Sequence, residues 1–423
     1  MAGRHSTIYV SLAAAMIFLG VLHLSRQGKG ITMMAPGSER YKEITAEDQT
    51  IMQEPEPLDT AWWTPFVNQM ARPFSILPKD PFWCVPRPIL EMTNGDNITT
   101  ASNKGLYLVK IPKTASSTAA GVTIQIARNT AARMASQTTI SDSLNMECMY
   151  HIDHGMAHVD RQDPFFLWTV VRHPAQRAVS HYFFGEVSRR GAPFTSDGMI
   201  ASLKRHVNFQ FRQLARKRVD DGNATLVQTR YHLESPRTTP KNVLDMIQTD
   251  ILENFHFIGI SERLDESLVA LKMILNLNME DVIGLSSKIS GKMDDGGFDG
   301  TCHNIQTSRT TAEVDQYLSQ EFRIDNYDFF LYDVANRSLD LTIDAFGREP
   351  FRKELEKYHA MKQYAEEQCL SKVLFPCTEV GQPPWPEAKH SCFKGDIGCG
   401  HECVQQALRE FATTPRYLTN RRK

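Results

Sequence analysis

Three short apolar runs, each followed by a helical pattern, constrain the fold of this chain more than any other feature. The runs are residues 106–111 (LYLVKI), 165–171 (FFLWTVV) and 255–260 (FHFIGI). Strands that are apolar on both faces belong inside a sheet, and a helix after each strand leads the chain back to a parallel neighbour. The sequence therefore predicts a three-layer α/β fold with a central parallel sheet.

The helices that follow these runs have recognisable starts and faces. The first is expected from about residue 117 to 134 and the second from about residue 175 into 185. Asp265 is the expected N-cap of the third helix, and leucines at 268, 271 and 275 give that helix one apolar face. Each strand is thus predicted to turn directly into a helix.

Composition narrows the classes of function. The chain has 423 residues, with 47 Lys and Arg against 49 Asp and Glu, and a formal net charge of −2. This balance argues against nucleic acid as a partner, because a globally basic surface would be needed. Hydrophobic residues make up 41% and charged residues 23%, which is ordinary globular usage and rules out wholesale disorder.

The N-terminal region predicts attachment to a membrane. Residues 8–24 form an apolar run that we interpret as a transmembrane signal anchor after a cytosolic tail of residues 1–7, although a cleaved signal peptide has a similar length. Residues 25–103 are rich in proline and predict a stem. The aromatic residues between 62 and 83 are too apolar for a solvated linker, so part of the stem should dock on the folded domain.

The C-terminal region, residues 346–423, predicts a helical, disulfide-rich extension. Residues 348–368 form a charged helix pattern, for which a solvated face is the plain interpretation. In an oxidising lumen the even number of cysteines predicts disulfides with undetermined pairing: Cys84, Cys148, Cys302, Cys369, Cys377, Cys392, Cys399 and Cys403. A zinc site from Cys392, Cys399 and Cys403 with His390 or His401 is the alternative, although the spacings lack a C-x2-C pair. Sequons at Asn97, Asn223 and Asn336 fit a lumenal surface.

The segment LVKIPKTASSTAAGV, residues 108–122, carries the strongest chemical signal. A strand-to-helix turn at the carboxyl end of a parallel sheet directs backbone N–H groups and a helix dipole at an anion. One cation and several hydroxyl groups lie on this turn and predict a phosphate-binding loop: Lys113, Thr114, Ser116, Ser117 and Thr118. The loop lacks both glycines of the G-x-x-x-x-G-K-[ST] motif of NTPases.

This loop resembles the 5′-phosphosulfate loop of the Golgi carbohydrate sulfotransferases, which use 3′-phosphoadenosine 5′-phosphosulfate (PAPS) as donor. The second motif of that family looks similar to VVRHPAQRAVSHYFF, where Arg172 and Ser180 have the spacing of the donor-binding pair. The acidic residue that usually precedes the proline is His173 here, which leaves the arginine and serine intact. An arginine fork and a hydroxyl suit one phosphate.

Two later blocks, FHFIGISERLDESLVALKMILNLNMEDV and DNYDFFLYDVANRS, look like segments of the galactose 3-O-sulfotransferases and, less closely, of the uronyl 2-O-sulfotransferases. The four blocks span residues 106–338. The resemblance implies a P-loop-like sulfotransferase domain over residues 104–345, a glycan or glycolipid acceptor, PAPS as donor without a metal, and a single-pass type II protein in the Golgi membrane with a lumenal catalytic domain. The acceptor sugar and the oligomeric state stay open.

The resemblance also assigns catalytic roles. Lys113 is expected to stabilise the negative charge that develops on the leaving oxygen. The acceptor hydroxyl needs a base, for which His154 ranks first and His158 second, with His151 and Glu262 as further candidates. Glu262 has the alternative of capping or anchoring its helix. His206 and Asn208 lie in a segment that is expected to approach the acceptor.

The sequence leaves open two alternative functions and the role of the basic clusters. A P-loop-type kinase predicts dependence on ATP and magnesium, and a membrane-tethered glycan-binding protein without catalysis predicts no nucleotide binding. Basic clusters at 189–190, 204–206 and 216–218 are either solvated helix faces or, if they converge on the cleft, a sign of an acidic or sulfated acceptor.

Overall fold

A computed structural model describes thirteen segments of the chain. These are residues 63–74, 84–86, 105–137, 146–154, 165–215, 219–220, 225–226, 240–285, 291–294, 301–372, 377–378, 380–382 and 400–413. The predicted signal anchor at 8–24, His158, and the sequons at Asn97 and Asn223 lie outside the described residues. None of the helices in the described ranges has the length and apolar character needed to span a bilayer.

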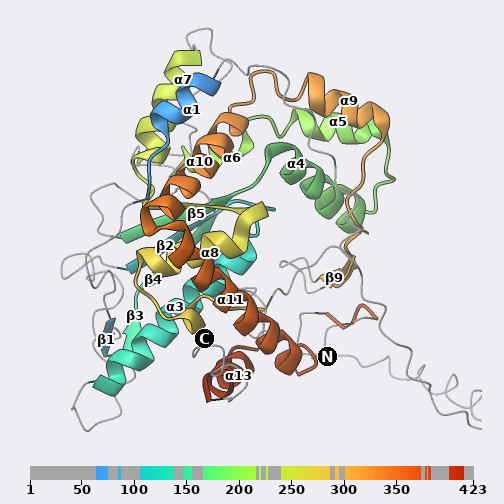
Figure 1. The fold of residues 1–423 in the computed structure, drawn as a ribbon. Helices are drawn as coiled ribbons and strands as arrows, with labels where there is room; N and C mark the ends of the chain where they lie inside the picture. Colours follow the sequence, from blue (N-terminus) through green and yellow to red (C-terminus); the bar gives the residue numbers. More distant parts are fainter. Residues whose placement is uncertain are drawn as a thin grey trace, which may run out of the picture. The chain divides into compact units, whose positions relative to one another are not determined.

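The predicted parallel sheet is present at the centre of the fold (Figure 1). Its strand order is β4-β2-β5-β8, and all three pairings are parallel. The strands are β2 (Gly105–Lys110), β4 (Tyr150–His154), β5 (Phe165–Val171) and β8 (Phe257–Ile260). The three apolar runs form β2, β5 and β8, as the sequence predicts. The polar strand β4 is at the edge beside β2, where only one face needs to be apolar.

Helices follow the three apolar strands. They are α3 (Ser116–Gln137) after β2, α4 (Pro174–Tyr182) after β5, and α8 (Leu264–Ile274) after β8. Helix α3 contacts β2 and β5, whereas α8 and α10 (Asp328–Phe346) contact β8. The predicted N-cap of α8 is wrong, because a 3-10 turn, Ser261–Arg263, precedes that helix and places Asp265 in its first turn. The Asp265 carboxylate instead accepts a hydrogen bond from Lys362 Nζ at 2.8 Å.

The remaining elements surround this framework. The helices are α1 (Thr64–Met70), α5 (Ser196–Lys204), α6 (Phe209–Leu214), α7 (Pro240–Met246), α9 (Ala312–Gln320), α11 (Arg348–Cys369) and α13 (His401–Thr413). Wider π-helical turns, Phe183–Arg189 and Ile247–Leu252, continue α4 and α7, and a 3-10 turn covers Met279–Asp281. Short antiparallel pairs are β1 (Cys84–Pro86) with β3 (Met146–Cys148), β6 (Val219–Asp220) with β7 (Thr225–Leu226), and β9 (Met293–Asp294) with β10 (His303–Asn304).

Part of the predicted stem docks on the folded domain. The indole N–H of Trp63 donates to the Asp333 carboxylate at 3.3 Å, and a guanidinium nitrogen of Arg72 donates to the Leu252 carbonyl at 2.6 Å. The ring of Phe74 packs edge-on against Phe257 of the central sheet, with the centroids 5.0 Å apart. This contact with the sheet explains why the aromatic residues occur in a proline-rich segment.

Disulfides confirm the prediction from the cysteines and determine part of the pairing. Cys302 pairs with Cys377, and Cys369 at the end of α11 pairs with Cys403 in α13. A third disulfide joins Cys84 to Cys148. The proposed zinc set that included Cys403 is therefore wrong, because a disulfide sulfur does not ligate zinc as a thiolate. Within the described ranges no group of acidic, histidine and cysteine side chains could hold a metal ion.

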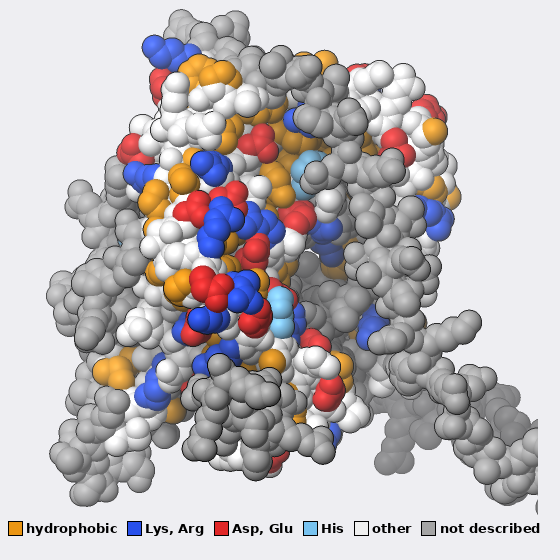
Figure 2. Space-filling view, in the orientation of Figure 1, with side chains coloured by type: hydrophobic (Ala, Val, Ile, Leu, Met, Phe, Trp, Pro, Cys, Tyr) orange, Lys and Arg blue, Asp and Glu red, His pale blue; other side chains and the backbone are white. Residues whose placement is uncertain are grey.

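Helix α11 has the solvated charged face that the sequence predicts. Arg352 pairs with both Glu349 and Glu356 along this helix, and Lys272 of α8 pairs with Glu354 at 2.8 Å. Figure 2 shows acidic and basic side chains interleaved on this side of the molecule. The side chains of Arg352, Glu349 and Glu356 are more than half exposed, so this face is a solvated surface, and water screens such pairs to a small effect on stability.

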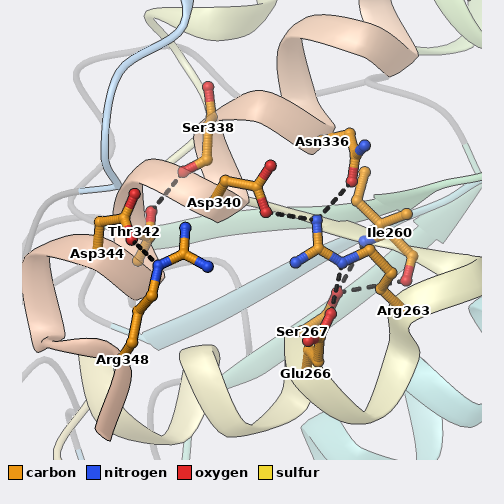
Figure 3. Close-up of polar contacts among 10 residues, drawn as sticks. All are labelled: Ile260, Arg263, Glu266, Ser267, Asn336, Ser338, Asp340, Thr342, Asp344 and Arg348. Carbon is orange, nitrogen blue, oxygen red and sulfur yellow. Dashed lines mark hydrogen bonds and ion pairs between the residues drawn. The ribbon is translucent and has the colours of Figure 1, made fainter. Parts of the chain in front are cut away.

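The sequon at Asn336 has a structural use. Asn336 lies within α10, and its side-chain oxygen accepts a hydrogen bond from Arg263 at 2.7 Å (Figure 3). Ser338, the third residue of the sequon, is 2% exposed and accepts a hydrogen bond from the backbone N–H of Arg72. Asn336 is half-buried and its side-chain oxygen is already used by Arg263, so this triplet has a role in the fold, and its use as a glycan acceptor stays a prediction.

Candidate active site

The loop after β2 has an unusual backbone. Lys113 has φ of 69° and Ala115 has φ of 59°, whereas Thr114 between them does not have a positive φ. Alternating signs of φ point successive N–H groups toward one side and create a concave anion site. Neither left-handed position is a glycine, although each costs about 1–2 kcal/mol for an L-residue. The loop thus has the shape of a phosphate-binding nest without the glycines that usually form one.

The polar residues of this loop divide into two roles. Thr114 is fully buried, and its hydroxyl donates to the Ile111 carbonyl at 2.9 Å, so it holds the turn together and has its backbone N–H to offer. Ser116 is the first residue of α3 and is nearly buried, while Ser117 and Thr118 are half-buried in the same helical turn. The N-terminus of this long helix adds a favourable dipole for an anion.

The side chain of Lys113 reaches the helical segment that continues α4. Its Nζ lies 3.9 Å from the ring centroid of Phe184, which belongs to the π-helix. The guanidinium carbon of Arg189 lies 5.2 Å from the same ring. The ammonium therefore lies between the first loop and the helix that follows the second one.

Arg172, at the end of β5, meets the first loop directly. Its Nη1 donates to the backbone carbonyl of Lys113 at 3.3 Å. The side-chain amide of Gln210, in α6, holds the Arg172 backbone from both sides, accepting from its N–H at 2.9 Å and donating to its carbonyl at 2.8 Å. The two motifs that the sequence separates by about sixty residues thus lie side by side at the carboxyl edge of the sheet.

A buried carboxylate supports this arrangement from behind. Asp328, fully buried at the start of α10, accepts the backbone N–H groups of Gln210 at 2.9 Å and Phe211 at 2.7 Å. Burial raises the pKa of Asp328, while these N–H groups and the nearby charge of Arg177 oppose that increase. Arg177 is also fully buried, with its guanidinium carbon 4.1 Å from the ring of Phe209. Burial lowers the pKa of Arg177 to about 10, so it stays a cation that faces Asp328.

Glu262 lies beside Arg172. Its Oε1 is 3.6 Å from Arg172 Nε and accepts the backbone N–H of His173 at 3.0 Å. Arg263 anchors the same short turn to α10 through Asp340 at 2.8 Å (Figure 3). Burial raises the pKa of Glu262, although its hydrogen bonds and Arg172 oppose the increase. This position favours an anchoring role for Glu262 over that of a general base.

His173 takes the place of the usual acidic residue without placing a charge there. Its ring contacts Phe329 and Tyr332 edge-on, with centroids 5.3 and 5.5 Å apart. Burial, assisted by the charges of Arg323 and Arg172, lowers the pKa of His173 to about 4. The imidazole is therefore neutral at physiological pH, and the carboxylate beside Arg172 comes from Glu262 instead.

The two candidate histidines of β4 lie at different distances from the carboxyl edge of the sheet. His154 ends β4 opposite Lys110 of β2, and burial together with the charge of Lys110 lowers its pKa. His151 packs edge-on against Phe165 in the lower part of the same strand, 5.1 Å between centroids. His154 is therefore at the carboxyl edge of the sheet with the two loops, whereas His151 is three residues before it.

A second pair of histidines joins His206, which the sequence analysis named, to His181, which it missed. His181 follows Ser180, which is half-buried in α4, and its ring lies 4.4 Å from that of His206. Burial lowers the pKa of His181 to about 3, and the charge of Lys113 contributes to this decrease. Burial likewise lowers the pKa of His206 to about 4. His206 and Asn208 are buried and bond to the backbone of Ser202 and Asp325, so both support the fold.

The second motif, residues 170–184, includes Arg177, His181 and Phe184. Their place in this motif was a sign that they lie near the site. Gln210 had no signal, because nothing in its local sequence points back to β5. Of the basic clusters, Arg189 reaches the ring beside Lys113, whereas Arg190 pairs with the surface carboxylate of Glu186 at 2.8 Å. The cluster at 216–218 lies outside the described residues.

Comparison with known proteins identifies the family. The family model described as galactose-3-O-sulfotransferase matches residues 119–382, well over half of the chain. The match includes β4, Arg172 and Ser180 and begins directly after the loop that carries Lys113. Searches of curated proteins and of solved structures found no match. On the strength of the family match, this chain belongs to the galactose-3-O-sulfotransferase family.

Proposed function

We propose that this protein transfers the sulfuryl group of PAPS to a hydroxyl of a sugar, with a 3-hydroxyl of galactose as the leading acceptor. The catalytic unit would be a P-loop-like domain over residues 104–345. The observation that carries the proposal is the hydrogen bond from Arg172 Nη1 to the Lys113 carbonyl, 3.3 Å long, which joins the two motifs of the predicted donor site.

The residues present fit the two ends of the donor. The nest at Lys113 and Ala115, followed by Ser116, Ser117 and Thr118 at the start of α3, suits the 5′-phosphosulfate. Arg172 and Ser180 would hold the 3′-phosphate, with the Arg172 backbone fixed by Gln210. When bound, PAPS supplies an activated sulfuryl group.

Lys113 would act on the charge that develops during transfer. By analogy with phosphoryl transfer, the transition state is loose and in line, and negative charge grows on the oxygen that leaves toward the 5′-phosphate. A preorganised ammonium stabilises this charge, and its compact shape allows it to follow the oxygen. This chain provides that ammonium at the end of β2, next to the first turn of α3.

The acceptor hydroxyl loses a proton, which His154 would take. Burial and the charge of Lys110 lower its pKa, which favours the neutral imidazole that can accept a proton. His158 remains the second proposed base. The acceptor is proposed to be a glycolipid, a glycoprotein glycan or a polysaccharide. The protein is proposed to be a single-pass type II protein of the Golgi membrane anchored by residues 8–24, with residues 346–423 as a C-terminal extension.

Transfer of label from PAPS to a panel of desulfated glycans tests this proposal. We expect incorporation into an acceptor with a terminal galactose and no dependence on added magnesium. Titration with 3′-phosphoadenosine 5′-phosphate (PAP) and with ATP separates the alternatives. Preference for PAP supports the sulfotransferase, preference for ATP supports a kinase, and binding of glycan without either nucleotide supports a glycan-binding protein.

A further inference from the structure

One aromatic ring links the ammonium of Lys113 to the helix of the second motif. Nζ lies 3.9 Å from the centroid of the Phe184 ring. This separation is well inside the range of about 6 Å over which an aromatic face attracts a cation. Phe184 is only half-buried, whereas the adjacent Phe183 is 1% exposed and belongs to the core. The two neighbouring rings therefore have different surroundings.

The π-helix brings a second cation to the same ring. The backbone N–H of Arg190 donates to the Gly185 carbonyl at 3.3 Å, five residues earlier, which is the bond of a π-turn. In such a turn residues five apart lie near one another, which explains why Arg189 also reaches the ring of Phe184. A regular α-helix would rotate these side chains to a different face. Single π-turns are rare and frequently occur at functional sites.

We propose that Phe184 is a positioning residue that holds the Lys113 ammonium where the leaving oxygen becomes charged. This inference rests on the proposed sulfotransferase function. A lysine side chain has many rotamers, and most of them point its charge away from any one atom. A ring face restricts the ammonium to a small volume and leaves its N–H donors able to turn toward an anion. Phe184 would thus act through Lys113 and not through contact with the sugar.

Substitution of the ring tests the role. Phe184→Leu retains an apolar side chain and removes the aromatic face, so kcat should fall roughly 2- to 30-fold, the range expected for one cation–π contact. The affinity for PAP and the thermal stability should change little. Phe184→Tyr and Phe184→Trp retain a ring face and should restore most of the turnover. If leucine sustains the wild-type kcat, the proposed role is wrong.

Phe194 provides a matched control. Its ring is also half-buried, and the guanidinium carbon of Arg309 lies 5.0 Å from its centroid. Phe194→Leu therefore removes a similar contact between a cation and a ring away from Lys113. We expect its kcat to equal that of the wild type. An equal decrease in both variants would assign the effect to general packing and overturn the inference.

A series of fluorinated phenylalanines tests whether the contact between Phe184 and Lys113 acts electrostatically. Phenylalanine with one, two or three fluorine atoms at position 184 keeps its shape while its face loses negative potential. The logarithm of kcat should decrease with each fluorine. If the wild type transfers sulfate and the series is flat, the positioning role fails while the proposed function stands.

A measurement without turnover separates the inference from the function. Reductive methylation with ¹³C keeps the positive charge of lysine and makes each ammonium visible by NMR. The resonance assigned through Lys113→Arg should be shifted upfield by the ring current, and Phe184→Leu should remove this shift. An unshifted resonance in the wild type would overturn the contact even if no acceptor is found.

Discussion

The two loops that meet at the candidate site are built in opposite ways. After β2 the chain turns through Lys113 and Ala115, two left-handed residues in a segment without glycine. After β5 it turns through His173, with φ of −49°, and Pro174 begins the helix with a preset backbone angle. The first loop has a strained backbone that presents N–H groups, whereas the second has a relaxed backbone that presents one side chain.

This difference determines where each loop obtains its support. The first is held locally, since Thr114 bonds to Ile111 within the same turn. The second is held from a distance, because Gln210 fixes the Arg172 backbone and Asp328 fixes the backbone of α6. A site made of backbone needs rare dihedral angles, whereas a site made of a long side chain needs partners elsewhere in the chain. We therefore expect the clearest effects from substitutions within the first loop and from substitutions of the distant residues that support the second loop.

Removal of the Lys113 ammonium should give the largest effect. We expect Lys113→Ala to lower kcat about 10²- to 10³-fold, the cost of losing one preorganised group that stabilises transition-state charge. Thermal unfolding should remain near that of the wild type. Lys204→Ala is the control, because its ammonium also lies on a ring, 5.8 Å from the centroid of Tyr317, away from both loops. Wild-type turnover in Lys113→Ala would remove the role assigned to this residue.

Loss of the remote support for the second loop should be the next largest effect. Gln210→Leu leaves the N–H and carbonyl of Arg172 without their partner, which should destabilise the fold by about 1–3 kcal/mol and weaken PAP binding. Gln125→Leu is the control, since Gln125 is another buried amide that bonds to backbone, at the carbonyls of Glu280 and Ile283. Calorimetric titration and urea unfolding would show a stability loss in both variants and an affinity loss in Gln210→Leu alone. Equal PAP affinity would contradict the proposed support.

The extent to which sequence predicted this site follows from the same difference. The roles of Arg172 and Ser180 came from the resemblance to the family and stay predictions. The local signals were sufficient for β2, β5, β8 and the polar turn that carries Lys113, because apolar runs and turn residues lie next to one another in the chain. They failed for Gln210 and Asp328, whose roles depend on contacts more than thirty residues away in sequence. They also failed for the backbone of Lys113 and Ala115, because residues without glycine give no sign of a left-handed turn. The polar edge strand β4 has no apolar run, so its local sequence did not predict it.

Acid should destabilise the fold, because three histidines with lowered pKa values lie in and near the second loop. Burial holds the pKa of His173 and His206 at about 4 and that of His181 at about 3, whereas unfolded histidines have a pKa near 6.5. Between these values the unfolded chain binds more protons than the folded chain. The free energy of unfolding should therefore be retained above about pH 6.5 and decrease as the pH falls toward 4.

Thermal unfolding at a series of pH values checks this expectation. His206→Gln removes one of the three groups while retaining a donor for the Ser202 carbonyl, so its unfolding temperature should depend less steeply on pH than that of the wild type. The comparison should be made from pH 7.5 to 5, where the difference in bound protons develops. An identical slope in both proteins would show that His206 is not kept neutral in the folded chain.

The smallest expected effect is a change in stability that has opposite signs in the two loops. Ala115→Gly relieves a left-handed alanine, worth about 1–2 kcal/mol, and increases the freedom of the unfolded chain, worth about 0.5–1 kcal/mol. The net effect should be a stabilisation of up to about 1.5 kcal/mol. Ala175→Gly, at the second position of α4, has no strain to relieve and should destabilise by about 1 kcal/mol through lost helix propensity. Urea unfolding of the two variants measures both signs, and destabilisation of equal size in both would mean that the backbone at Ala115 is not strained.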